Sequence, residues 1–167
     1  SVVDINSFEF EKTITVSLNP NYIYSDSDGD VYVICMSDYS DDKSYIVQRI
    51  DAKTDEVKTV EGIKAYKMTV ADDLAYIMFN DYYANEVKYY KYDLKNEKLL
   101  SDNFITDGTV VSSPNGIGVD PVTGDIYVGK SNKKNNGDVY VFSSEGKLKS
   151  QFETLPYPAD FVFMTHK

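Results

Sequence analysis

The residues best suited to covalent chemistry are Cys35 and His166, the only cysteine and the only histidine among the 167 residues. Cys35 lies in the apolar run at 31–36, where a thiol typically behaves as a small buried hydrophobe. His166 lies one residue from the end of the sequence, where chains fray. The sequence contains no G-x-S-x-G or H-E-x-x-H pattern, and one cysteine cannot form an internal disulfide or a cysteine-based zinc cluster. We therefore predict no catalytic residue and expect a protein that is not an enzyme.

The net charge of the chain argues against two classes of partner. Lysine and arginine number 17 against 27 aspartate and glutamate, which gives a net charge of −10. A surface of that sign repels phosphate backbones and anionic lipids, so neither nucleic acid nor a membrane surface is an expected partner. The longest apolar run, at 31–36, is far shorter than the roughly 20 residues that a membrane-spanning helix needs. No signal-peptide pattern opens the sequence, but a processed product would look the same.

One acidic cluster could in principle hold a hard cation. The stretch SDSDGD, residues 25–30, is similar to a calcium-binding loop, although such loops need more oxygen ligands in a fixed order. The stretch DPVTGD at 120–125 occupies the same place in the repeat described next without the extra acids. Because Asp and Gly favour turns, we interpret both stretches as turns and predict no metal site and no cofactor.

The elements that position these residues follow from an internal repeat. Three stretches, starting at Pro20, Ala65 and Pro114, each contain short alternating strands separated by polar turns. Equivalent positions recur at intervals of roughly 40–50 residues, which is the size of one blade of a β-propeller. The positions that keep this spacing are the starts Pro20, Ala65, Pro114 and Pro158; the acids Asp30, Asp73 and Asp125; the third-strand ends Ile50, Tyr92 and Phe142; and the fourth-strand starts Val57, Leu99 and Leu148.

The repeat predicts an all-β fold with little helix. We expect residues 1–167 to form a single β-propeller segment with three complete four-stranded blades, approximately at 20–60, 65–101 and 114–153, and one edge strand at each end, at 8–17 and 158–164. This is about half of a seven-bladed propeller. The residues expected to be buried between blades are Val31, Val33, Ile50, Ile117, Val119, Ile126, Val128, Phe142 and Phe161. Because a broken ring exposes unpaired strand edges, we expect pairing with a missing propeller half or with a second copy.

The last part of the chain resembles a known family. The stretch PNGIGVDPVTGDIYVGKSNKKNNGDVYVFSSEGKLKSQFETLPYPADFVF, starting at residue 114, is similar to the C-terminal end of YncE-like, surface-layer-type seven-bladed propellers. The resemblance is weaker over 18–101. It implies an exported bacterial lipoprotein, located at the cell surface or in the periplasm, whose last short strand completes the first blade. Asp160 stands where that family often has histidine. Some relatives capture vitamin B12 at the cell surface, so capture of a small cofactor is one alternative function.

A second alternative is enzymatic. The fragment PNGIGVD is also similar to a stretch of calcium-dependent lactonase propellers, in which an asparagine near the tunnel mouth binds the metal. That resemblance implies that Asn115, together with Asp160 one blade later, could point at a common axial site. Against this reading, PNG also serves as a turn that opens a blade, and no glutamate is placed to complete the ligand shell.

Four tyrosines are candidates for ligand contact. The loops at 37–44, 80–86 and 130–137 should emerge on one face of the propeller, together with the links between blades. Tyr39, Tyr82, Tyr83 and Tyr157 would then gather around one end of the central tunnel. Tyrosine combines a rigid apolar ring with a polar tip, which suits a ligand face. The same residues could equally cover the edges of blades.

The sequence therefore predicts a non-enzymatic binding or scaffold module of an exported propeller protein. We expect its ligand, a small molecule or a surface protein, at the loop face near the tunnel, with Asn115, Asp160 and the four tyrosines as candidate contacts. A fold of this kind hosts unrelated functions, so the ligand itself does not follow from it.

Overall fold

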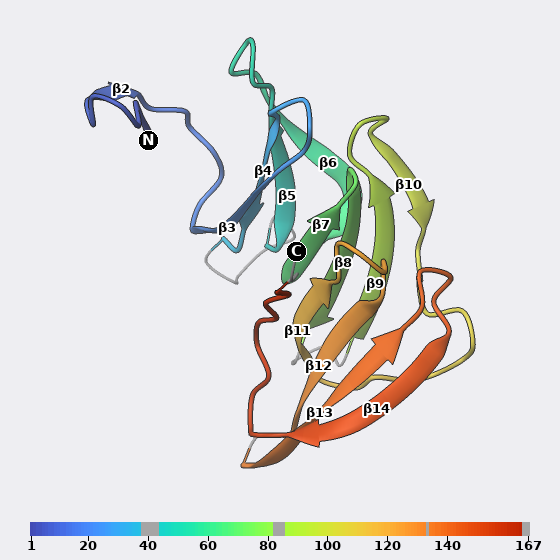
Figure 1. Cartoon of the computed structure of the whole chain (residues 1–167). Coiled ribbons are helices and arrows are strands. Elements are labelled where there is room, and N and C mark those ends of the chain that lie inside the picture. The colour runs from blue at the N-terminus through green and yellow to red at the C-terminus, as the bar shows by residue number, and fades with distance from the viewer. Residues whose placement is uncertain (38–43, 82–85, 133, 165–167) are drawn as a thin grey trace.

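A computed structural model describes residues 1–37, 44–81, 86–132 and 134–164. Within these ranges the chain forms fourteen β-strands and no helix (Figure 1), so the prediction of an all-β fold is confirmed. The described residues accordingly contain no helix that is long and apolar enough to cross a membrane.

Twelve of the strands form three four-stranded antiparallel sheets, each made from consecutive strands. We call them blades 1, 2 and 3. Blade 1 contains β3 (Pro20–Ser25), β4 (Val31–Cys35), β5 (Ile46–Ile50) and β6 (Val57–Lys64). Blade 2 contains β7 (Lys67–Ala71), β8 (Leu74–Asp81), β9 (Glu86–Asp93) and β10 (Lys98–Ser101). Blade 3 contains β11 (Pro114–Val119), β12 (Ile126–Asn132), β13 (Asn135–Phe142) and β14 (Leu148–Thr154).

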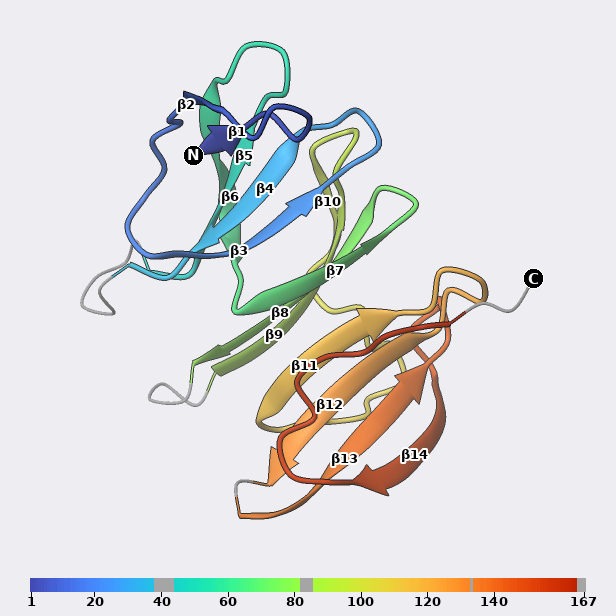
Figure 2. The ribbon, with the colours of Figure 1, turned by 60° about the vertical axis from the view of Figure 1, so that its left-hand side comes forward.

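The first strands of the three blades lie next to one another. β3 contacts β7, and β7 contacts β11, while the later strands of each blade lie farther out (Figures 1 and 2). This is the arrangement of consecutive propeller blades around a common axis. A β-propeller segment is therefore confirmed.

Polar turns between strands explain why the repeat keeps its spacing. In the turn after β5, the Asp51 carboxylate accepts hydrogen bonds from the backbone N–H groups of Lys53 and Thr54, both at 2.9 Å, and Asp55 adopts a φ of 60°. Aspartate favours such turns because its short side chain can bond the backbone two or three residues onward.

Most of the apolar core lies between successive blades in two layers, and a smaller cluster around Val33, Cys35 and Ile50 lies on the outer face of blade 1. One layer joins blades 1 and 2, and the other joins blades 2 and 3. Tyrosines fill much of both layers, and their hydroxyl groups donate to backbone carbonyls: Tyr32 to Leu94 at 2.9 Å and Tyr89 to Val111 at 2.8 Å. A buried phenol is stable only when its hydroxyl group is paired in this way.

Most of the predicted core is confirmed. The members buried between blades 2 and 3 are Ile117, Val119, Ile126, Val128 and Phe142. Val33 and Ile50 are also buried, but in the cluster on the outer face of blade 1 and not between blades. Val31 and Phe161 are instead half-buried. Val31 belongs to the outer face of blade 1, and Phe161 lies beyond the outer face of blade 3, so each has a blade on one side only.

The two edge strands at the ends are not formed as predicted. At 8–17, only β2 (Phe10–Lys12) is a strand, and it pairs with β1 (Val2–Val3) in a small hairpin because no neighbouring blade offers it an edge. Residues 158–164 form no strand. They cross the face of blade 3 in front of β11 and β12 (Figure 2), and no strand of the described residues pairs with them.

Candidate functional site

Glycines on blade 3 allow the C-terminal segment 158–164 to lie very close to the sheet. A Cβ atom on Gly129 would lie 2.3 Å from the carbonyl oxygen of Pro158, and one on Gly116 would lie 2.6 Å from that of Ala159. A Cβ on Gly118 would lie 2.7 Å from the Cβ of Phe161. Real Cβ contacts are essentially never this short, so only glycine fits at these positions. The close approach places Asp160 beside the inner strands.

Lys67, the first residue of β7, reaches this segment from blade 2. Its ammonium donates a hydrogen bond to the backbone oxygen of Ala159 at 2.7 Å and forms an ion pair with Asp160. The Lys67 side chain is 7% exposed, whereas that of Asp160 is 76% exposed. The Lys67 Nζ also lies 5.2 Å from the ring centroid of Tyr22, within the range of a cation–π contact. A buried ammonium is thus neutralised by a carboxylate that faces solvent.

These residues share one position in the repeat. Each of the four is the third residue of its unit, counted from the starts Pro20, Ala65, Pro114 and Pro158: Tyr22, Lys67, Gly116 and Asp160. Equivalent residues on the innermost strands of successive blades lie at one level of a propeller axis, which explains why side chains so far apart in sequence meet. We call Tyr22, Tyr24, Lys67 and Asp160 the axial cluster.

Tyr24 completes the axial cluster as a neutral group. Its hydroxyl oxygen accepts a hydrogen bond from the backbone N–H of Met68 at 3.4 Å. Burial, with a smaller contribution from the charge of Asp160, raises the pKa of Tyr24 to about 12 against the opposing effect of the Met68 N–H. The phenol therefore stays protonated at neutral pH and cannot act as a base. The cluster offers a paired charge, a hydroxyl group and an aromatic face, which are groups that bind rather than react.

The predicted pair Asn115 and Asp160 does not form a cluster of metal ligands. Asn115 is half-buried near the start of β11, and the carboxylate of Asp160 is bound to the Lys67 ammonium. Among the described residues, no three His, Cys, Asp or Glu side chains gather in a way that could hold a metal ion. Of the four predicted tyrosines, Tyr157 is exposed with a φ of 59°, while Tyr39, Tyr82 and Tyr83 lie outside the described residues.

The acidic stretch 25–30 forms a turn, as predicted. The Asp26 carboxylate accepts hydrogen bonds from the backbone N–H groups of Asp28, at 3.0 Å, and Asp30, at 2.9 Å. Asp28 lies 3.8 Å from the Nζ of Lys95. The carboxylates of this turn are thus engaged by backbone and by lysine.

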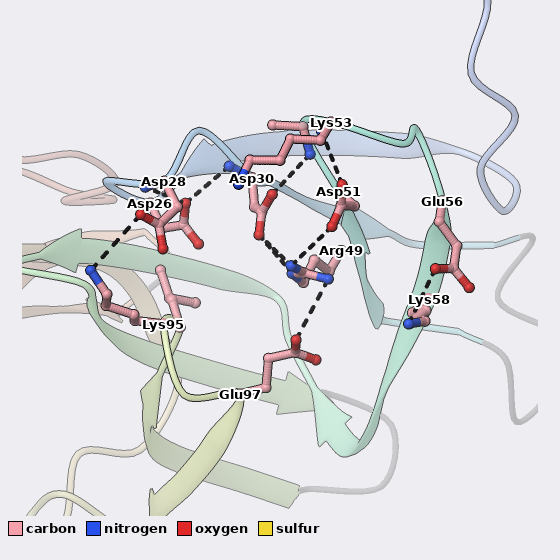
Figure 3. A network of polar contacts seen from close by, with 12 residues as sticks. Asp26, Asp28, Asp30, Arg49, Asp51, Lys53, Glu56, Lys58, Lys95 and Glu97 are labelled. Carbon is pink, nitrogen blue, oxygen red and sulfur yellow. Dashed lines mark hydrogen bonds and ion pairs between the residues drawn. The ribbon is translucent and has the colours of Figure 1, made fainter.

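Arg49 joins this turn to blade 2 (Figure 3). Its guanidinium donates to Asp30, with an Nε–Oδ2 distance of 3.0 Å, and lies 3.5 Å from both Asp51 and Glu97. Glu97 belongs to the turn before β10, so the pairs connect neighbouring blades. The repeated acid is used likewise elsewhere: Asp125 pairs with Lys149. These contacts give the acids of the repeat a structural role.

Two further features of the sequence are typical of functional sites, a phosphate-binding loop pattern and a single cysteine, but neither has the surroundings that such a site requires. The stretch GDIYVGKS at 124–131 has the G-x-x-x-x-G-K-S spacing of a phosphate-binding loop, but most of it lies in strand β12 and a second strand follows, whereas such a loop must lead into a helix. Cys35 is fully buried, and burial raises the pKa of its thiol. It therefore carries little thiolate at neutral pH, in agreement with its interpretation as a core residue.

No protein-family model matches the chain, and no curated protein matches it. Solved structures do. A gluconolactonase from Xanthomonas campestris has a TM-score of 0.59 at 15% identity, covering 93% of this chain and 54% of that one. The β-propeller domain of the Trilobed protease from Pyrococcus furiosus has a TM-score of 0.55 at 10% identity, covering 86% and 45%. A chain of a nidogen–laminin complex has a TM-score of 0.53 at 15% identity, covering 86% and 49%.

These identities are too low to carry function and show the fold alone. This chain spans about half the length of each of the three matched chains. The repeat, the three sheets and the structural matches agree on one statement: the chain is a segment of a β-propeller.

Proposed function

We propose that the chain is a non-catalytic binding or scaffold module of an extracytoplasmic propeller protein, with its ligand held beside the axial cluster. The observation that carries this proposal is the contact of Lys67 with Asp160 and the ring of Tyr22. Three elements distant in sequence meet there, and the exposed carboxylate remains accessible to a ligand. The location outside the cytoplasm rests on the resemblance of residues 114–164 to exported propellers.

The axial cluster favours binding over lactone hydrolysis. A calcium ion prefers six to eight oxygen ligands. At this site it would have to separate Asp160 from a buried ammonium and would leave that charge without its carboxylate, which is strongly unfavourable. Vitamin B12 capture stays a separate alternative that rests on the resemblance alone. A small molecule or a surface protein is the proposed kind of ligand.

The proposal can be tested by assaying turnover and binding in the same preparation. We expect no hydrolysis of δ-gluconolactone with or without calcium, and no heat of calcium binding in calorimetry. Calcium-dependent hydrolysis that disappears in Asn115→Ala would contradict the proposal and support the lactonase alternative.

Ligand location requires a second assay. Cyanocobalamin, sugar acids and short peptides are screened for a rise in melting temperature, since a ligand that binds only the folded state stabilises it. We expect a responding probe to lose its effect in Lys67→Met and to keep it in Lys95→Met, because the Lys95 side chain is exposed and pairs with Asp28, outside the axial cluster. Equal responses of both variants would show that the ligand does not bind at the axial cluster.

A further inference from the structure

We propose that a groove on the outer side of blades 1 and 2 binds an extended acidic segment of a partner protein, in the way that residues 103–107 of this chain lie between blades 2 and 3. The groove shares no residue with the axial cluster, so this site is independent of the ligand proposed there.

The groove consists of two adjoining hollows, of about 450 and 280 Å³. Residues 59–61 of β6 form one wall of both hollows. On the side of blade 2, Tyr90 lines the larger hollow and Tyr92 lines the smaller one. These tyrosines lie two residues apart on β9, a separation of roughly 7 Å, which is also the distance between successive side chains on one side of an extended peptide. A peptide that follows the groove would therefore place one side chain in each hollow.

The wall formed by β6 has backbone groups that its own sheet does not use. β6 pairs with β5 at Thr59, opposite Gln48, and again at Lys64, opposite Ile46. Residues 60–63 lie between these two pairs and are outside the ladder. β6 is also the last strand of blade 1, and no strand of the described residues pairs with its other edge. Backbone N–H and C=O groups at such an edge can pair with an added extended peptide.

The junction between blades 2 and 3 contains an extended segment of the chain itself. Residues 102–113 link β10 to β11 (Figure 1), and Phe104 and Ile105 of this link are buried between the two blades. The backbone N–H of Phe104 donates to the carbonyl oxygen of Tyr89 at 2.9 Å. The ring of Phe104 also makes an edge contact with that of Tyr89, with 5.4 Å between the centroids. Both the backbone and the side chains of the segment thus bind blade 2.

The same segment continues onto blade 3. The backbone N–H of Thr106 donates to the carbonyl oxygen of Gly146 at 2.9 Å. The carboxylate of Asp107 accepts a hydrogen bond from the backbone N–H of Leu148 at 2.7 Å. An extended segment with apolar residues followed by an acid therefore fits between two blades of this propeller.

The corresponding place between blades 1 and 2 is the proposed groove. In the repeat, Glu97 and Leu99 of blade 2 hold the positions that Gly146 and Leu148 hold in blade 3, and both line the smaller hollow. The link from β6 to β7 consists only of residues 65–66, so it leaves this place open. A segment from another protein can take the position that residues 103–107 take at the next junction.

The charge of the groove favours an acidic segment. The whole chain has 17 basic residues against 27 acidic ones, whereas the lining of the groove has four against three. These lining residues are Arg49, Lys58, Lys64 and Lys88 and, on the acidic side, Glu61, Glu86 and Glu97. The ammonium of Lys64 lies 5.8 Å from the ring centroid of Phe79, and no carboxylate of the described residues forms an ion pair with it. A carboxylate of the bound segment would supply that partner.

A synthetic peptide with the sequence of residues 102–108, DNFITDG, capped at both ends, is the probe. Titrated into the isotope-labelled full chain and followed by NMR, it should shift the amide signals of residues 58–64 and 88–92. Lys64→Glu and Lys88→Glu should each weaken binding about fivefold or more, because each places a carboxylate where the groove has an ammonium. The Lys88 side chain is 46% exposed, so its replacement should leave the melting temperature unchanged.

Lys95→Glu is the matched control. It changes the net charge by the same amount, but Lys95 pairs with Asp28 outside the groove, so binding should stay the same. A peptide carrying Phe104→Ser and Ile105→Ser keeps both acids and should bind about fivefold more weakly, because it loses its apolar side chains.

Four results would overturn the proposal. The first is the absence of any shift at 58–64 with millimolar peptide, and the second is equal weakening by Lys95→Glu, which would show that overall charge alone attracts the peptide. The third is a set of shifts confined to Tyr89, Gly146 and Leu148, because the peptide would then exchange with the chain's own segment. The fourth is tighter binding of trigalacturonate at the same amides, which would assign the groove to an acidic saccharide.

Discussion

Replacing Gly129 by alanine should dislodge the C-terminal segment from blade 3. The added Cβ would lie 2.3 Å from the carbonyl oxygen of Pro158 and about 3.0 Å from the Cγ of the proline ring. Contacts below 3.0 Å require a shift, and the oxygen belongs to the backbone, so rotating a side chain cannot relieve the clash. Gly129 is paired with Val139 and Gly116 in the middle of the sheet, which leaves the strand little freedom to move. We therefore expect residues 158–164 to move instead.

The cost follows from the contacts that the segment makes. Full burial of a phenylalanine side chain contributes about 1.5–3 kcal/mol, so two half-buried rings, Phe161 and Phe163, contribute about 2 kcal/mol together. The contacts of Lys67 with Ala159 and Asp160 add about 1–2 kcal/mol, because their loss leaves a buried ammonium unpaired. The substitution should thus reduce the free energy of unfolding by about 3–4 kcal/mol, which corresponds to a fall in melting temperature of roughly 6–16 °C for a chain of this size.

Thermal and urea unfolding followed by circular dichroism measure this change, and a truncated chain ending at residue 154 supplies the control. In the truncated chain the same substitution meets no segment and should cost less than about 0.5 kcal/mol, so the two changes should be strongly non-additive. A Gly129→Ala variant that melts within a degree of the parent would refute the packing of the segment. An equal cost in both backgrounds would show that the strain lies within blade 3.

Four further predictions follow from burial and pairing. Ile126→Asp should lower the free energy of unfolding by several kcal/mol because Ile126 is fully buried, whereas Val122→Asp in an exposed turn should change it little; chemical denaturation measures both. Asp160→Ala should lower the free energy of unfolding by about 1–2 kcal/mol, because it leaves a buried ammonium without its carboxylate. Lys67→Met leaves only an exposed carboxylate and should lower it less. Equal losses in the two variants would show that the ion pair does not form. Because burial raises the pKa of Tyr24 from 10.0 to about 12, its contribution to stability should be complete below pH 10 and be lost as the pH rises towards 12. Urea unfolding should therefore show a larger loss of stability between pH 10 and 12 in the parent than in Tyr24→Phe, and equal losses would contradict this. Cys35 should react with a thiol reagent only at the rate of unfolding, because it is fully buried and burial raises its pKa; rapid labelling of the folded chain would place it at the surface.

The strands and buried residues of the three blades can be predicted from the sequence because each blade requires the same pattern of apolar residues and turns. Each blade needs alternating apolar residues at fixed distances from a polar turn, so the acids Asp30, Asp73 and Asp125 and the core residues Ile126 and Phe142 recur in phase. In a single unit, the alternation of apolar residues would not distinguish a propeller blade from unrelated short strands. Three units in step define both the strands and the face that each side chain occupies.

The ends were predicted less well because a repeat specifies a strand only when its neighbours exist. Residues 158–164 carry the pattern of a first strand, and their phenylalanines face blade 3 as that pattern requires. Hydrogen bonding, however, depends on the second strand of the same blade, which these residues lack. At the other end, Phe10 pairs back onto Val3 for the same reason. Alternation can therefore predict which side of a segment is buried without predicting that the segment joins a sheet.

The sequence predicts only one member of the ion pair in the axial cluster. The resemblance of the C-terminal stretch points to Asp160, whereas Lys67 has the sequence context of an ordinary lysine at the start of a strand. Periodicity is detected by matching similar residues, whereas the position occupied by Tyr22, Lys67, Gly116 and Asp160 holds four different types. In a propeller, the residues at this position of successive blades lie around the axis at one level. The chemical groups that meet there therefore depend on how the residue type differs between units. An acid in one unit and a lysine at the same position of another predict an ion pair between the innermost strands, so an inner-strand position whose residue type differs between units is one to examine for a binding site.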